Sequence, residues 1–242
     1  MNELNYALNT IFFLISGAMV MWMAAGFTAL EAGSVRTKNV TEILTKNVAL
    51  FAVASIAFLL CGYKIMYGWV EPAGHAMYAD FFFQMVFVAT AMSVVSGAVA
   101  ERKKLWSFLI FSAVFAAVIY PLEGAWTWGG GFLSGLGFVD FAGSGIVHMA
   151  GASAALAAVL LIGPRDGKYD KNGKPKNIPG NNMPLVALGT LILWLGWFFF
   201  NGGSQLKFDT MSDAQALGKI FVNTNMAAAG GLLGAMIVSK LW

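Results

Sequence analysis

Residues 144–161, SGIVHMAGASAALAAVLL, decide the fold class. The stretch runs for 18 residues with one histidine and no Asp, Glu, Lys or Arg. A helix that crosses a bilayer needs about 20 mainly apolar residues, because lipid cannot hydrogen-bond an open backbone. The stretch therefore predicts a transmembrane helix.

Six more apolar runs of similar length flank this one. The seven expected spans are residues 11–30, 48–66, 81–100, 105–122, 144–161, 183–200 and 220–238. The composition agrees, since 58% of the 242 residues are hydrophobic and 11% are charged, whereas soluble chains carry about 25% charged residues. We expect an all-α, polytopic transmembrane helix bundle and exclude a soluble globular domain.

The basic residues predict the orientation of this bundle. Twelve of the 15 Lys and Arg follow the first, third, fifth and seventh spans, and the positive-inside rule makes that side cytoplasmic. The N-terminus is then outside the cell membrane, and the segment after the seventh span is inside. MNELNYALNT, residues 1–10, has no basic cluster, so no cleavable signal peptide is expected. The basic residues are spread over loops, which argues against nucleic acid as a partner.

Ionisable residues at membrane depth are costly and often line a pathway. His148 lies inside the fifth span, and the alternative role is a buried histidine that is hydrogen-bonded within the packing. Asp140 precedes that span and is placed to cap its helix. Glu31 is expected to pair at the membrane interface with Arg36 or Lys38, and Glu101 with the adjacent Arg102.

Aromatic rings are the second candidate feature, because a dehydrated cation can be held over a ring face. Trp128 in WTWGGGFLSG is a candidate ring, although Trp also anchors helices at membrane interfaces. Trp197, Phe200 and Ser204 are spaced to share one helix face. Phe87 adds a ring near the outer part of the third span. Rings in such positions more often face lipid than form a gate.

Enzyme and metal signatures are missing from the sequence. There is no HExxH, GxSxG or Walker A motif, and two His with one Cys cannot form a usual zinc site. His75 is expected to be solvated in an outer loop. We therefore expect neither an enzyme nor a cofactor or metal site.

Several motifs in this order resemble the Amt/Mep/Rh family of ammonium transporters. They are LEAGSVRTKN (30–39), SGAVAERKKLW (96–106), WGGGFLSGLGFVDFAGSGIVHMAGASAAL (128–156), GWFFFNGGS (196–204) and FVNTNMAAAGGLLGA (221–235). The resemblance implies an ammonium transporter or channel that recruits ammonium at an outer aromatic site and conducts ammonia, with or without separate proton transfer. It also implies a homotrimer, methylammonium as a substrate analogue and a possible cytoplasmic PII-type regulator.

The resemblance also implies roles for the candidate residues. Phe87, Trp128 and Ser204 match the recruitment site, and Phe87 with Phe200 match the rings that close the pore mouth. His148 matches the first of two pore histidines. Trp197 matches a pore-lining residue, and Asp140 matches a carboxylate that supports the recruitment site.

The sequence departs from the family pattern in its length. Family members have about eleven spans in two inverted five-helix repeats, with sites between the halves. Here the first repeat covers about residues 1–165 and an incomplete second repeat about 180–242 of a single domain, 1–242. We expect a fragment of a longer transporter; the alternative is a truncated product. Two other functions stay open: an ammonium-sensing membrane module of a larger signalling protein, and a channel for another small neutral gas.

Overall fold

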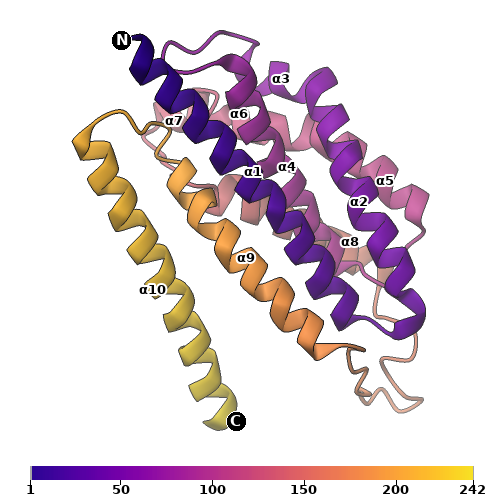
Figure 1. Ribbon diagram of the computed structural model, residues 1–242. Helices are drawn as coiled ribbons and strands as arrows, with labels where there is room; N and C mark the ends of the chain where they lie inside the picture. The colour runs from indigo at the N-terminus through magenta and orange to yellow at the C-terminus, as the bar shows by residue number, and fades with distance from the viewer. Residues whose placement is uncertain (1, 242) are drawn as a thin grey trace.

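The computed structural model describes residues 2–241 as a bundle of helices (Figure 1). The elements are α1 (Glu3–Ser34), η1 (Thr37–Asn39), α2 (Val40–Ala57), η2 (Phe58–Gly62), α3 (Tyr63–Tyr67), α4 (Met77–Ala98), α5 (Leu105–Val114), η3 (Phe115–Ile119), α6 (Tyr120–Thr127), α7 (Phe132–Gly135), η4 (Ser144–Met149), α8 (Ala150–Ile162), α9 (Met183–Gly203) and α10 (Met211–Leu241). Within the described residues there is no β-strand, only one isolated bridge in the loop after α8.

These elements form seven helical spans long and apolar enough to cross a membrane, which confirms the predicted bundle. The spans extend beyond the apolar runs because polar residues cap them. Asn2 accepts a hydrogen bond from the Asn5 backbone N–H at 2.8 Å before α1, and Asn182 accepts one from Leu185 before α9. Such side chains satisfy amide groups that a helix leaves open at its start.

Helix α4 occupies the centre of the bundle, in contact with α1, α2 and α8. Its most apolar window is 72% buried, whereas that of α10 is 6% buried. In Figure 1, α10 runs beside α9 and stands apart from the other helices. Most of the α10 surface is therefore uncovered by the described chain.

The longest helix–helix contact joins α1 and α9, which lie side by side (Figure 1). The contact depends on Gly189, because a Cβ there would lie 2.5 Å from the Leu30 backbone nitrogen and 2.6 Å from the Gly26 carbonyl oxygen. Small residues let helix backbones approach closely in membranes. The packing of α9 on α1 holds the candidate residues of α9 in place.

Three spans contain a π-helical segment, which the sequence did not predict. These segments are η2, η3 and η4. In η4 the His148 backbone N–H donates to the Gly143 carbonyl oxygen five residues earlier, at 3.0 Å. A π-helical turn inserts one extra residue into a helix, and such turns are frequent at functional sites.

Glu31 forms a buried ion pair with Lys46 and not with Arg36 or Lys38, so the expected interfacial pairing was wrong. The Lys46 Nζ lies 2.8 Å from Glu31 Oε2, and the two side chains are 0% and 3% exposed. Ser96 and Asn47 also donate hydrogen bonds to Oε2. The pair forms because the start of α2 places Lys46 against the end of α1, where α4 excludes water from both groups.

Glu101 binds Arg36 and Arg165, at 3.1 and 3.2 Å, and not the adjacent Arg102. Arg102 instead donates to the carbonyl oxygens of Ala98 and Gly163. Burial alone would raise the pKa of Glu101, but hydrogen bonds from the Arg36 backbone and side chain and from Asn39 lower this pKa to about 2. Glu101 therefore joins the loops that follow the first, third and fifth spans, which we call the basic end of the bundle.

Candidate functional site

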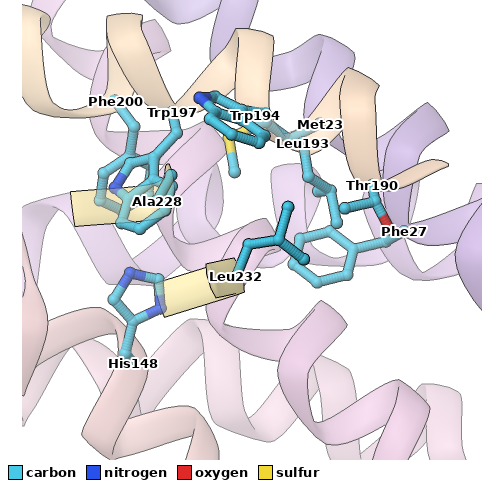
Figure 2. A pocket seen from close by; sticks show the side chains of 10 residues that line it. All are labelled: Met23, Phe27, His148, Thr190, Leu193, Trp194, Trp197, Phe200, Ala228 and Leu232. Atoms are coloured by element: carbon cyan, nitrogen blue, oxygen red, sulfur yellow. The ribbon is translucent and has the colours of Figure 1, made fainter. Parts of the chain in front are cut away.

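Two cavities follow one another along the bundle, one at the end away from the basic end and one near the middle. The first, which we call the end cavity, has a volume of about 240 Å³ and is lined by Tyr67, Pro72, His75, Asp80, Phe83, Gln84, Phe87, Trp128, Phe141, Ser204 and Leu206. The second, which we call the mid-bundle pocket, has a volume of about 350 Å³ and is lined by Met23, Phe27, His148, Thr190, Leu193, Trp194, Trp197, Phe200, Ala228 and Leu232 (Figure 2).

Residues from three separate helical spans meet in the end cavity. Phe87 comes from α4, Trp128 follows α6, and Ser204 ends α9. The Phe87 and Trp128 rings meet edge to face with centroids 6.1 Å apart. Ser204 Oγ donates to the Phe200 carbonyl oxygen at 2.8 Å, so its lone pairs can still accept a hydrogen bond. The structure thus brings together all three residues predicted for recruitment.

Phe87 and Phe200 lie at the boundary between the two cavities. Their ring centroids are 4.2 Å apart at an interplanar angle of 34°, and each residue is 1% exposed. Phe87 lines the end cavity and Phe200 lines the mid-bundle pocket. A hydrated ion could pass from one cavity to the other only if these rings moved.

His148 lies on the wall of the mid-bundle pocket, with its imidazole directed towards Phe200 and Trp197 (Figure 2). The His148 and Phe200 rings are stacked with centroids 5.4 Å apart. The His148 side chain is exposed and makes no hydrogen bond to any residue between 2 and 241. The residues between 2 and 241 thus supply no hydrogen bond of the kind that a buried packing histidine would make.

Asp140 caps the helix that carries His148, as its position predicted. Its Oδ1 accepts hydrogen bonds from the backbone N–H groups of Gly143 and Ser144, and its Oδ2 accepts from Gly145 and Ile146, all at 2.8–3.0 Å. The Trp128 Nε1 also donates to the Asp140 backbone carbonyl at 2.7 Å. Asp140 lines neither cavity; its side chain contacts the start of η4, and its backbone carbonyl contacts Trp128.

Trp197, Phe200 and Ser204 share one face of α9, as their spacing predicted, and this face spans both cavities. The same spacing argument, applied to α4, would have found two residues that sequence reasoning missed. Asp80 and Gln84 stand seven and three residues before Phe87 and line the end cavity beside it.

His75 is not solvated as expected. Its ring stacks on Phe13 with centroids 4.0 Å apart, and its Nε2 lies 3.7 Å from Asp80 Oδ1. It lines the end cavity too. No group of three or more His, Cys, Asp or Glu among residues 2–241 is arranged to hold a metal ion.

The family model described as Ammonium Transporter Family matches residues 11–242. The chain belongs to the ammonium transporter family. The curated relatives that the chain matches are ammonium transporters, which are not enzymes. The chain is 46% identical to ammonium transporter Amt2 of Archaeoglobus fulgidus, over 94% of this chain and 53% of the relative. It is 40% identical to a putative ammonium transporter of Synechocystis, over 97% of this chain and 47% of the relative.

Solved structures of ammonium transporters have the same fold. A structure described as a sensor Amt protein is 35% identical, with a TM-score of 0.90 over 98% of this chain and 63% of that one. Mep2 of Candida albicans is 28% identical, with a TM-score of 0.83 over 97% of this chain and 55% of that one. The chain thus spans about half the length of the curated ammonium transporters it matches.

Proposed function

We propose that this chain supplies the recruitment site and part of the conduction path of an ammonium transporter. The observation that carries the proposal is the order of three features along one path. The aromatic end cavity comes first, the Phe87–Phe200 ring pair next, and the apolar pocket with His148 last. Family membership supports ammonium as the substrate.

Each feature has a distinct physical task in the proposed mechanism. The faces of Phe87 and Trp128 attract a cation as it loses water, and the Ser204 oxygen accepts a hydrogen bond from ammonium. The apolar wall of the mid-bundle pocket disfavours a charged ion, because a buried charge without partners is costly. Ammonium therefore gives its proton to water on the end-cavity side of the ring pair, or passes it separately to His148, and neutral ammonia enters the pocket.

His148 is the group that receives the permeant species in this mechanism. A neutral imidazole has one donor and one acceptor nitrogen, so it can pass a hydrogen bond or a proton along a dry path. Trp197 closes the wall of the pocket beside it. In the assembled protein we place the end cavity outside the cell membrane and the basic end in the cytoplasm, where a PII-type regulator would bind. We further propose a homotrimer with one path per subunit and methylammonium as an alternative substrate.

The test is uptake of radiolabelled methylammonium by cells that express the native protein or its variants. His148→Ala and Asp140→Ala should abolish uptake, since they remove the pocket histidine and the cap that positions it. Met149→Ala is the matched control, because Met149 is 60% exposed and faces a different groove. Unchanged uptake in correctly folded His148→Ala and Asp140→Ala proteins would refute the proposal.

A second candidate function is ammonium sensing without transport. The observation that favours it is the TM-score of 0.90 to the structure described as a sensor Amt protein. Sensing would use the same end cavity for binding but would not require passage between the two rings. Saturable binding of methylammonium by purified protein, with no uptake into proteoliposomes, would identify the sensor.

A further inference from the structure

The wall of the end cavity carries a single carboxylate among its lining residues, that of Asp80. Asp80 is in the first turn of α4, on the same helix face as Gln84 and Phe87. Its side chain is 13% exposed. One negative charge therefore borders a small cavity whose other walls are mainly aromatic and apolar.

One hydrogen bond holds the Asp80 carboxylate, and a histidine lies beside it. Tyr63 Oη, from α3, donates a hydrogen bond of 2.5 Å to Oδ2. His75, from the loop between α3 and α4, lies 3.7 Å from Oδ1, which is too long for a hydrogen bond. The His75 ring is itself held against Phe13 of α1. Oδ1 thus keeps acceptor capacity for a ligand in the cavity.

Asp140 differs from Asp80 in its hydrogen bonds and in its position relative to the cavity. All four of its close contacts are backbone N–H groups, two on each oxygen, and it does not line the cavity. Its negative charge is compensated by the start of a helix. Asp80 also lies in the first turn of a helix, but its carboxylate accepts one hydrogen bond, from Tyr63, and borders the cavity. Because it lines the cavity, Asp80 contributes more of the negative potential inside it than Asp140 does.

We propose that Asp80 is a positioning residue for the incoming cation, which its carboxylate attracts into the end cavity and orients towards the Phe87 and Trp128 rings. This inference rests on the proposed function and adds a residue to it. A cleft with one sign of charge and low-dielectric walls concentrates counter-ions at its mouth. The occupant is a small monovalent cation with N–H donors, such as ammonium or methylammonium.

The competing role for Asp80 is structural, since an acidic residue in the first turn of a helix stabilises that helix. The concentration dependence of uptake separates the two roles. Asp80→Asn keeps the shape and one acceptor oxygen but removes the charge. Glu71→Gln is the matched control, because Glu71 is an exposed carboxylate near the same end of the bundle that does not line the cavity.

The experiment is methylammonium uptake by the native protein in proteoliposomes, at low and at high salt. For Asp80→Asn we expect the KM to rise about tenfold at low salt, the effect of one unit charge across a small cavity, with the maximal rate within about twofold of wild type. High salt should narrow this difference. Asp80→Glu should restore most of the affinity, and Glu71→Gln should leave the KM unchanged.

Failure of this inference differs from failure of the proposed function. Suppose that the wild-type protein transports methylammonium. An Asp80→Asn KM within twofold of the wild-type KM, or equal to the KM of Glu71→Gln, then overturns the role of Asp80. A wild-type protein that does not transport overturns the transport function, and the same variants are then compared by equilibrium binding of methylammonium. A tenfold weaker affinity of Asp80→Asn supports the inference there, and an unchanged affinity overturns it. If Asp80→Asn does not fold, Tyr63→Phe replaces it as the test variant, because it frees Oδ2 of Asp80 without changing the charge. Tyr63→Phe should keep a KM near that of wild type. A tenfold rise in its KM would show that Asp80 has a structural role.

Discussion

Replacement of Lys46 by methionine should destabilise the protein far more than loss of an ordinary surface lysine. The substitution keeps most of the side-chain volume but removes the cation that faces Glu31. Glu31 would remain 3% exposed with its negative charge, and only Ser96 and Asn47 would donate hydrogen bonds to it. Lys38→Met is the control, because Lys38 is an exposed lysine in η1, just before α2.

The size of the effect follows from the geometry of the pair. At the observed 2.8 Å and an effective dielectric constant of about 20, two unit charges attract by about 6 kcal/mol. Desolvation of each ion costs several kcal/mol, so the intact pair contributes little net stability. Removal of Lys46 leaves the desolvation cost of Glu31 without a compensating attraction. We therefore expect the free energy of unfolding to fall by about 3–5 kcal/mol.

Thermal unfolding in detergent, followed by circular dichroism, measures this loss. A domain of this size loses about 2–4 °C in Tm per kcal/mol, so Lys46→Met should lower the Tm by at least about 6 °C. The double variant Glu31→Gln/Lys46→Met should recover part of that loss, because no unpaired charge remains. A Lys46→Met shift as small as that of Lys38→Met, or a double variant whose loss equals the sum of the single losses, would refute the reasoning.

Three further predictions concern the basic end and the α1–α9 contact. The pKa of Glu101 is lowered from 4.5 to about 2 in the folded protein. The stability that ionised Glu101 gives the fold should therefore be complete above about pH 4.5 and be lost as the pH falls towards 2. Glu101→Gln should flatten the dependence of Tm on pH in that window. Burial, with the nearby charge of Lys46, lowers the pKa of Lys103 from 10.5 to about 6. Protonation of Lys103 therefore favours the unfolded chain below pH 10.5. Lys103→Met should raise the Tm at pH 7 and change the Tm less at pH 10. Gly189→Ala should cost about 1–3 kcal/mol of unfolding free energy through overpacking. Gly230→Ala, where a Cβ would meet no atom within 4 Å, should not lower stability in the same denaturation assay, because alanine favours a helix more than glycine does.

The seven spans could be predicted because the requirement for apolar length is strong and local. Each expected apolar run falls on an observed helical span. The shared face of Trp197, Phe200 and Ser204 was equally predictable, since the helix between them is regular. The capping role of Asp140 followed from its position just before a span.

Side-chain partners between distant segments were harder to predict. Neighbours in sequence suggested Arg102 for Glu101 and Arg36 or Lys38 for Glu31, but packing of separate helices supplied other partners. The π-helical segments have no sequence signal comparable to apolar length. The carboxylate of Asp80 escaped notice because a first-turn acidic residue has an ordinary structural explanation.

The π-helical segment that carries His148 affects how the fifth span can be mapped by labelling. An α-helix turns by about 100° per residue, so one inserted residue shifts the rotational phase of everything that follows it. A cysteine scan of α8 should place the accessible positions about 100° away from where an uninterrupted α-helix starting at residue 144 would place them. A sequence alignment that inserts or deletes one residue near position 148 would shift the predicted lipid-facing side of α8 by about 100°.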